Sequence, residues 1–322
     1  MELVAVDIGG THVRFAVATL TAQGTVTLGE TLTLRTADHT TFLAAWHAFA
    51  RRYGGRLPRA VALSVAAPVA GAEIRLVNNP WTIPRATIAA QIGVDHILIL
   101  NDFAAVGHAV ANLPEDCFAH VCGPDRPLPV AGTISILGPG TGLGIAHVWR
   151  DEAGYRVQAT EGGHFSFAPI DPCDDRLLAR LRQRHARVSA ERVAAGPGIV
   201  DIHAVLAGEH GHDAPACDDR TIWQQGISRR EPLAAEAVER FCRQLGAIAG
   251  DVTLVQGGSA CVIAGGLGLR LRDVLPESGF GRYFRAKGRF TGTMAAMPVK
   301  LIVHPQPGLF GAAAAFAGEY AA

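Results

Sequence analysis

Two stretches of this 322-residue chain read alike: Val4-Ala-Val-Asp-Ile-Gly-Gly-Thr-His-Val-Arg-Phe-Ala16 and Ile134-Ser-Ile-Leu-Gly-Pro-Gly-Thr-Gly-Leu-Gly-Ile-Ala146. Each predicts a strand, a glycine turn and a second strand. Gly10-Thr11 aligns with Gly140-Thr141 at an offset of 130 residues. The repeated unit indicates a duplicated domain with a cleft between its copies, a common place for a ligand.

Apolar strands alternate with helical patterns along the rest of the chain. Strands are expected at 3–6, 13–18, 25–34, 60–65, 97–100, 133–137, 143–148, 261–264 and 299–303. Helices are expected near 41–53, 85–92, 176–185, 189–195, 199–207 and 233–255, and from Leu309 onward. Buried strands mixed with crossover helices predict an α/β fold.

Composition excludes several classes of protein. Apolar residues make up 49% of the chain and charged residues 18%, enough to bury a core and to exclude disorder as the main state. Lys plus Arg and Asp plus Glu are 29 each, and this balance argues against a dedicated nucleic-acid binder. No apolar run approaches the roughly 18 residues that span a bilayer, so no membrane partner is expected.

The chain's first residues and its cysteines indicate the compartment. The N-terminus carries Glu2 and Asp7 without a basic region, which argues against a signal peptide. The six cysteines form no Cys-x-x-Cys pair and are expected to be reduced thiols of a cytoplasmic protein.

The first turn, within Asp7-Ile-Gly-Gly-Thr-His-Val-Arg14, is a candidate phosphate site. Glycines let successive backbone N–H groups approach an anion. A carboxylate at a strand end can hold Mg²⁺ directly or through water. The alternative is an ordinary hairpin with a polar turn.

The second turn, Gly138-Pro-Gly-Thr-Gly-Leu-Gly144, is denser in glycine, and Thr141 adds a hydroxyl. It lacks the Gly-Lys-Ser/Thr of a Walker A loop. It also fails G-x-G-x-x-G, and strand-like residues follow it where a dinucleotide site would open a helix. A phosphate loop is therefore favoured over a dinucleotide enzyme, with a plain hairpin as the alternative.

Several polar residues follow apolar segments. Asp102 comes just after a strand, where it could accept a proton from a substrate hydroxyl or cap the next helix. Glu161-Gly-Gly-His164 puts a carboxylate and an imidazole around a turn, suited to vicinal sugar hydroxyls, although His164 alone could be structural. Glu191 begins a helix, where an acid is favourable in any case. Gly265-Gly266 ends a strand and suits either a flat adenine or a tight turn.

The segment 208–220 is rich in His and Asp and is expected to be the least ordered. Its spacing matches no standard zinc pattern. A solvated loop is the better interpretation of its candidate ligands, which are His210, His212, Asp213, Cys217 and Asp218.

Taken together and in this order, the motifs resemble the bacterial glucokinase family of the actin-like sugar-kinase superfamily. The resemblance covers essentially the whole chain. It is carried by Asp7-Ile-Gly-Gly-Thr11, Leu100-Asn-Asp-Phe-Ala-Ala-Val106, Gly138–Gly144, Glu161–His164, Val188–Val193 with Gly196-Pro-Gly198, Ile263–Gly266, Lys287-Gly-Arg-Phe290 and Pro307-Gly-Leu-Phe-Gly311.

The resemblance implies a two-lobed, actin-like (ribonuclease H-like) fold of duplicated α/β domains with an interlobe cleft. The lobes would be residues 1–112 plus 304–322 and residues 113–303. The implied activity is phosphorylation of the 6-hydroxyl of D-glucose by ATP with Mg²⁺, in a homodimer.

The resemblance also implies site roles. Asp102 would be the catalytic base and Asp7 would position Mg²⁺. The sugar ligands would be Asn101, Asp102, Glu161, His164 and Glu191. The nucleotide would contact Asp7, Gly9, Gly10, Thr11, Gly138, Gly140, Thr141, Gly142, Gly265 and Gly266.

The chain departs from the family pattern in one place and lacks two features of a related group. His12 stands where the family more commonly has Asn. The cysteine-rich zinc motif of the repressor–kinase group is absent, and a strand starting at residue 3 leaves no room for that group's helix-turn-helix.

The alternative functions are a kinase for fructose, mannose or an N-acetyl sugar, and a catalytically silent sugar sensor. The donor could also be another nucleotide or polyphosphate.

Overall fold

The structure is a computed structural model that describes residues 1–21, 24–76, 79–212 and 217–320. The chain forms two compact units. The first comprises Met1–Leu113, Val157–Ala159 and His304–Ala322, and the second comprises Pro114–Arg156 and Thr160–Val303.

The first unit is built on one mixed sheet with the strand order β3-β2-β1-β5-β8. β1 is antiparallel to β2 and parallel to β5, and β5 is parallel to β8. A fourth N-terminal strand, β4, also pairs with β2, and β6 and β7 form a separate hairpin. The bounds are β1 Glu2–Ile8, β2 His12–Leu20, β3 Val26–Leu28, β4 Leu32–Arg35, β5 Ala60–Val65, β6 Glu73–Arg75, β7 Thr82–Pro84 and β8 His96–Asn101.

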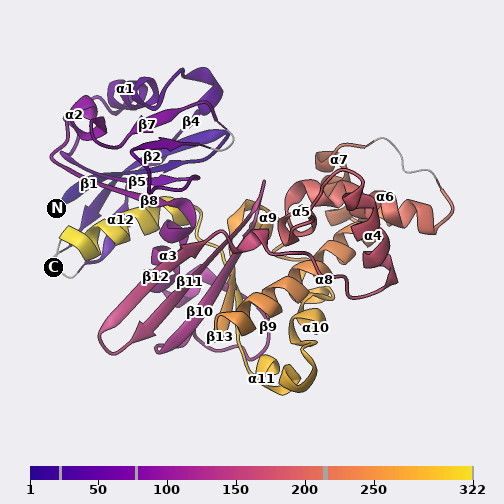
Figure 1. Cartoon of the computed structure of the whole chain (residues 1–322). Helices are drawn as coiled ribbons and strands as arrows, with labels where there is room; N and C mark the ends of the chain where they lie inside the picture. The colour runs from indigo at the N-terminus through magenta and orange to yellow at the C-terminus, as the bar shows by residue number, and fades with distance from the viewer. Residues whose placement is uncertain (22–23, 77–78, 213–216, 321–322) are drawn as a thin grey trace. The chain divides into compact units, whose positions relative to one another are not determined.

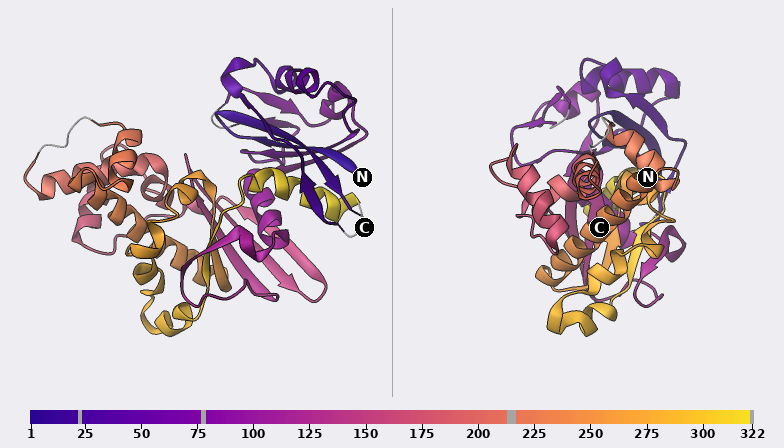
Figure 2. Two further views of the ribbon diagram at one scale, coloured as in Figure 1. Left: turned by 180° about the vertical axis from the view of Figure 1, so that it is seen from behind. Right: turned by 90° about the vertical axis from the view of Figure 1, so that its right-hand side faces the viewer.

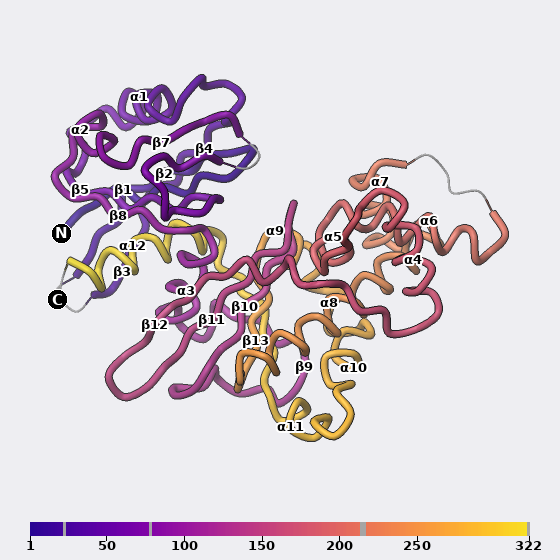
Figure 3. Tube along the Cα trace, in the orientation of Figure 1, coloured from indigo at the N-terminus to yellow at the C-terminus, as the bar shows by residue number. Residues whose placement is uncertain are grey.

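The second unit repeats this pattern in the order β12-β11-β10-β13-β14-β9. β10 is antiparallel to β11 and parallel to β13, and β13 is parallel to β14, so β10 takes the place of β1. The bounds are β9 Phe118–Cys122, β10 Gly132–Pro139, β11 Leu143–Asp151, β12 Gly154–Thr160, β13 Gly258–Ile263 and β14 Val299–Ile302. This shared topology confirms the predicted α/β duplication (Figure 3).

Helices cover both sheets (Figures 1 and 2). The first unit has α1 Phe42–Tyr53, α2 Ile88–Ile92, α3 Asp102–Asn112 and α12 Pro307–Tyr320. The second has α4 Pro172–Arg182, α5 Ala190–Ala194, α6 Ile199–Glu209, α7 Asp219–Ile227, α8 Pro232–Val255, α9 Gly265–Arg270, α10 Phe280–Arg285 and α11 Thr291–Ala295. The apolar stripe predicted for 233–255 is buried in α8. No helix among the described residues is long and apolar enough to cross a membrane.

The two faces of the first sheet carry side chains of different size. The face toward α1 is lined by large residues such as Val6, Phe15 and Leu63. The face toward α12 is lined by small ones, including Ala5 and Ala62. Small side chains let a helix backbone approach closely, and this brings α12 onto the sheet.

α12 also packs tightly on α3, its neighbour in the views of Figures 1 and 2. A Cβ at Gly311 would lie 1.7 Å from the carbonyl oxygen of Ala105 in α3. No side chain fits in that space, so glycine at this position sets the helix–helix distance.

Two expectations about the first unit are wrong in detail. The strand predicted over 25–34 is two strands, β3 and β4, interrupted at Gly29, whose N–H donates to the Val17 carbonyl at 2.8 Å. The helix predicted over 85–92 begins only at Ile88, because residues 82–84 pair with β6.

The structure adds elements that the sequence did not predict. β12 is an edge strand whose alternate residues are exposed, and α10 and α11 are short. In the segment 208–220, Asp218 caps α7 and His210 Nε2 lies 2.8 Å from Glu236 Oε2. Asp213 lies outside the described residues.

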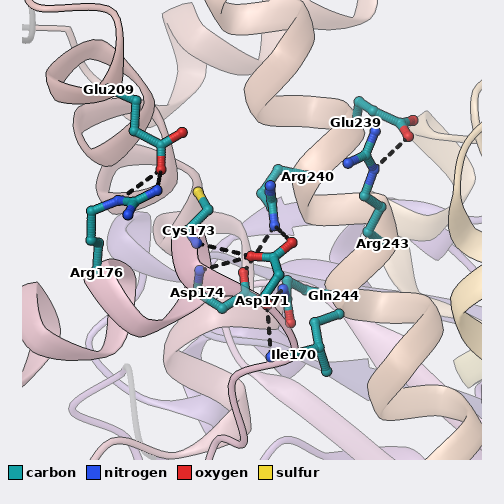
Figure 4. A network of polar contacts seen from close by, with 10 residues as sticks. All are labelled: Ile170, Asp171, Cys173, Asp174, Arg176, Glu209, Glu239, Arg240, Arg243 and Gln244. Atoms are coloured by element: carbon teal, nitrogen blue, oxygen red, sulfur yellow. Dashed lines mark hydrogen bonds and ion pairs between the residues drawn. The ribbon is translucent and has the colours of Figure 1, made fainter.

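A buried polar network ties the start of α4 to α8 (Figure 4). Asp171 caps α4 by accepting from the N–H groups of Cys173 and Asp174. The fully buried Asp174 carboxylate accepts from the Ile170 N–H at 3.1 Å and from the Gln244 side chain. Arg240 contacts both carboxylates. Burial raises the pKa of Asp174 above its usual value of 3.8.

This network predicts a pH-dependent stability. Asp174 binds a proton more tightly in the folded state than in the unfolded state. The contribution of Asp174 to the free energy of unfolding therefore falls as pH rises from 3.8 through the folded pKa. Asp174→Asn removes this dependence. The stability of the variant relative to wild type should therefore rise with pH from about 4 and then level off. Urea unfolding of both proteins between pH 4 and pH 7 measures this, and a difference that does not change with pH would contradict it.

Candidate active site

Three polar side chains form one row across the first sheet. Asp7 on β1 is paired in register with Arg14 on β2 and with Ser64 on β5. Each lies an even number of residues from the alanines that face α12, so the row lies on that face.

The row holds both oxygens of the Asp7 carboxylate. The Ser64 hydroxyl donates to Oδ1 at 3.1 Å, and Arg14 Nη1 donates to Oδ2 at 3.2 Å. Burial raises the pKa of Asp7, while the Arg14 charge and the hydrogen bonds from Ser64 and Arg14 oppose that rise. Its side chain keeps 20% exposure, so it is partly accessible.

Asp7 fits the magnesium role that the family resemblance implies. Mg²⁺ in phosphate sites is usually bound by one or two carboxylates together with substrate phosphates and water. A carboxylate that remains partly accessible at the end of a strand can meet this need. Across the described part of the chain, no group of three or more His, Cys, Asp or Glu residues could hold a metal ion by itself.

The first glycine turn is a closed hairpin. The Gly9 N–H donates to the His12 carbonyl at 2.9 Å. Thr36 fixes the turn from the side, since its hydroxyl donates to the Gly10 carbonyl at 2.8 Å and its N–H donates to the Thr11 carbonyl at 3.0 Å. A phosphate cradle at this turn would therefore use the N–H groups of Gly10 and Thr11.

The structure tests one of the two local interpretations of Asp102, that it caps the next helix. The N-cap of α3 is Asn101, whose side-chain oxygen accepts from the N–H groups of Phe103 at 2.9 Å and Ala104 at 3.3 Å. Asp102 is the first residue of the helix, and the N-cap alternative for it is wrong. Asn101 thus fixes the backbone that carries Asp102 at the carboxyl end of β8.

The second glycine turn links β10 to β11. The Gly140 N–H donates to the Gly142 carbonyl at 2.8 Å, and the Gly140 carbonyl accepts from the Gly196 N–H at 2.8 Å. Gly196 belongs to one of the motifs that carry the resemblance, and it lies directly on this turn.

Other predicted site residues converge on the same turn. Glu191 Oε2 accepts the Leu143 N–H at 3.0 Å, and a Cβ at Gly142 would lie 2.6 Å from that oxygen. A Cβ at Gly163 would lie 2.2 Å from the Leu143 carbonyl oxygen. Glycine is needed at residue 163, because backbone occupies the space of a side chain there, whereas at residue 142 the neighbour is the end of the Glu191 side chain.

His164 and Glu191 are brought together by backbone pairing. The Ala190 N–H donates to the Phe165 carbonyl at 2.8 Å, and the Phe167 N–H donates to the Val188 carbonyl at 3.0 Å. These bonds align the residue before Phe165 with the residue after Ala190. His164 Nδ1 lies 4.0 Å from Glu191 Oε1, and both side chains are partly exposed. Glu161 is exposed at the start of the same turn, and its carbonyl accepts the His164 N–H at 3.1 Å.

Gly265 and Gly266 open α9 instead of forming an isolated turn. Gly265 has φ +80°, and a Cβ there would lie 2.9 Å from the Pro139 carbonyl oxygen. The adenine candidate therefore lies against the second glycine turn, within the same unit.

The predicted residues divide between the units. Asp7, Asn101 and Asp102 belong to the first, and Glu161, His164 and Glu191 belong to the second. Sequence reasoning missed Ser64 as a partner of Asp7 and gave Arg14 no role. The signal was available, because a polar residue inside the apolar strand 60–65 breaks its pattern.

Comparison with known proteins gives one family. The glucokinase family model matches residues 3–319. The chain is 49% identical over 320 residues to the glucokinase of Zymomonas mobilis, covering 99% of each chain. A glucokinase structure from an Antarctic psychrotroph matches with TM-score 0.86 and 29% identity, over 98% of this chain and 99% of the other. A glucokinase from Balamuthia mandrillaris, solved in complex with glucose, shares the fold with TM-score 0.78 and 20% identity, over 98% and 93% of the two chains. Because the family model covers nearly the whole chain and a full-length glucokinase is 49% identical to it, this chain belongs to the glucokinase family.

Proposed function

We propose that this protein is a glucokinase that transfers the γ-phosphoryl group of ATP to the 6-hydroxyl of D-glucose. The observation that carries the proposal is the convergence on one glycine turn of Gly163, Glu191, Gly196 and Gly265, which come from three separate motifs. Full-length identity of 49% to a glucokinase supports the same activity.

Asp102 is the proposed general base. It follows the cap residue Asn101 at the start of α3, on a backbone held by two capping hydrogen bonds. A fixed carboxylate can orient the sugar hydroxyl and take its proton as phosphoryl transfer proceeds. Because such transfer needs little covalent help from the protein, correct placement of the hydroxyl supplies much of the rate.

Four further side chains are the proposed sugar ligands. Asn101 uses its oxygen for the cap and donates one amide hydrogen to the Ala67 carbonyl at 3.4 Å, so its second amide hydrogen is the proposed donor to the sugar. Glu161, His164 and Glu191 accept from or donate to the remaining hydroxyls. A site built to hydrogen-bond hydroxyls rejects analogues that leave its polar groups unpaired.

Backbone N–H groups are the proposed phosphate ligands. In the first turn they come from Gly10 and Thr11, next to Gly9. In the second they come from Gly138, Thr141 and Gly142, while Gly140 shapes the turn, because its own N–H donates to the Gly142 carbonyl. Gly265 and Gly266 are the proposed adenosine contacts, and Asp7 the proposed ligand of Mg²⁺. When bound, Mg²⁺ neutralises phosphate charge.

The family resemblance supports three further parts of the proposal. The lobes are residues 1–112 plus 304–322 and residues 113–303. The protein acts in the cytoplasm, and it assembles as a homodimer. Light scattering of the purified protein tests the last point, since a mass near one chain would contradict it.

A coupled assay for ADP release tests the activity. With Mg-ATP, glucose is expected to give strong turnover, and fructose, mannose and N-acetylglucosamine little. Turnover with another sugar but not with glucose would show that the protein is a kinase for that sugar. No turnover with any sugar in folded protein would contradict the kinase proposal.

Asp102→Ala is expected to lower kcat by at least about 10²-fold, the lower end for loss of a general base, while glucose still binds by calorimetry. Asp219→Ala is a matched control, because Asp219 is also the first residue of a helix and also accepts the next residue's N–H. Near-wild-type turnover of Asp102→Ala would contradict the assignment.

Glu191 is expected to serve both the sugar and the second turn, and two variants separate these tasks. Glu191→Ala should raise KM for glucose about tenfold or more and lower the free energy of unfolding by about 1.5–3 kcal/mol, the range for hydrogen bonds to charged groups. Glu191→Gln keeps an acceptor for the Leu143 N–H, so it should recover the stability but not the KM for glucose. Steady-state kinetics and urea unfolding measure the two effects, and equal behaviour of both variants would contradict the double role.

A further inference from the structure

Gly308, the second residue of α12, lies directly on the Asp7 carboxylate. A Cβ at this position would be 2.9 Å from Asp7 Cγ, 2.9 Å from Oδ1 and 3.1 Å from Oδ2. The two separations of 2.9 Å are shorter than real Cβ atoms show, and the separation of 3.1 Å is tighter than most, so a side chain here would require the carboxylate to shift. At Gly318, on the same helix, a Cβ would meet nothing within 4 Å.

The three nearly equal distances describe the contact. A point equidistant from the carboxyl carbon and both oxygens lies over the flat face of the group, so the carboxylate rests face-on against the helix backbone. The first turn of a helix has N–H groups without intrahelical partners, and it favours negative charge. α12 is 14 residues long, so its N-terminus carries this partial positive charge.

The edge of the carboxylate is held from the sheet. Ser64 contacts Oδ1 at 3.1 Å and Arg14 contacts Oδ2 at 3.2 Å. Asp7 is therefore confined by β2 and β5 in its own plane and by α12 over its face. Any side chain at residue 308 would push the carboxylate out of this position.

We propose that Gly308 is a positioning residue: its lack of a side chain lets α12 close over Asp7 and hold the carboxylate in the orientation that binds the cation of the nucleotide. Ser64 and Arg14 act in the same way from the sheet. The inference rests on the proposed function for the identity of the cation. It deepens that function by giving α12, which carries Gly308, a role in orienting the carboxylate that binds the cation.

The first test is binding of Mg²⁺-ADP by calorimetry, with ADP in EDTA as the reference. Gly308→Ala should weaken Mg²⁺-ADP binding by about tenfold or more, as loss of support around a metal ligand does, and should leave ADP binding in EDTA unchanged. In kinetics, KM for Mg-ATP should rise while KM for glucose stays within about twofold. Gly318→Ala should match wild type in every measurement. A Gly308→Ala protein with wild-type Mg²⁺-ADP affinity would overturn the proposal.

The second test is a stability cycle, which separates positioning from general damage to the helix. Gly308→Ala should lower the urea midpoint in the wild-type background but not in an Asp7→Ala background, where the added methyl group has room. An equal loss in both backgrounds would overturn the proposal. Absence of sugar phosphorylation in wild type, together with the expected Mg²⁺-ADP difference, would remove the proposed function and leave the role of Gly308 in place.

Discussion

The close approach of α12 to the first sheet and to α3 is the constraint on which that unit depends. It requires small side chains on one sheet face, such as Ala5 and Ala62, and no side chain at Gly311. Ala and Gly give little apolar area individually, so this layer is stabilised by tight packing, in which a single added methyl group is costly. The same approach places the start of α12 on Asp7. Packing and placement of the carboxylate therefore have one structural cause.

In the second unit the corresponding constraint is the glycine turn between β10 and β11. Gly142 leaves space for Glu191, and Gly163 leaves space for the Leu143 carbonyl oxygen. Gly265 is the one residue of this group with a left-handed φ, +80°, so it is needed for backbone conformation as well as space. Close contact with neighbouring segments thus explains Gly142, Gly163 and Gly265 without a bound phosphate, whereas Gly140 has no such close neighbour.

The sequence predicted the elements whose patterns are long or strict, and it missed what depends on distant partners. The hairpins at 4–16 and 134–146 and the stripe of α8 follow from local periodicity. The proximity of His164 and Glu191 could not be predicted, because it arises from backbone bonds between segments more than twenty residues apart. Asn101 and Asp102 are both good capping residues, and only the backbone geometry shows that Asn101 is the cap. β12 was missed although its sequence alternates apolar and polar residues, which is the pattern of a half-buried strand.

The two units share a topology but not a chemistry. The offset that aligns Gly10 with Gly140 aligns Asp7 with Leu137. In the first sheet the row through Asp7 contains Arg14 and Ser64, whereas the row through Leu137 contains Ile145 and Ile263, all buried and apolar. A carboxylate at residue 137 would have no polar partner in its row, and its burial would be costly. Because only the first copy has polar partners in its row for a charge at this position, the proposed cation ligand has no counterpart at residue 137 of the second copy.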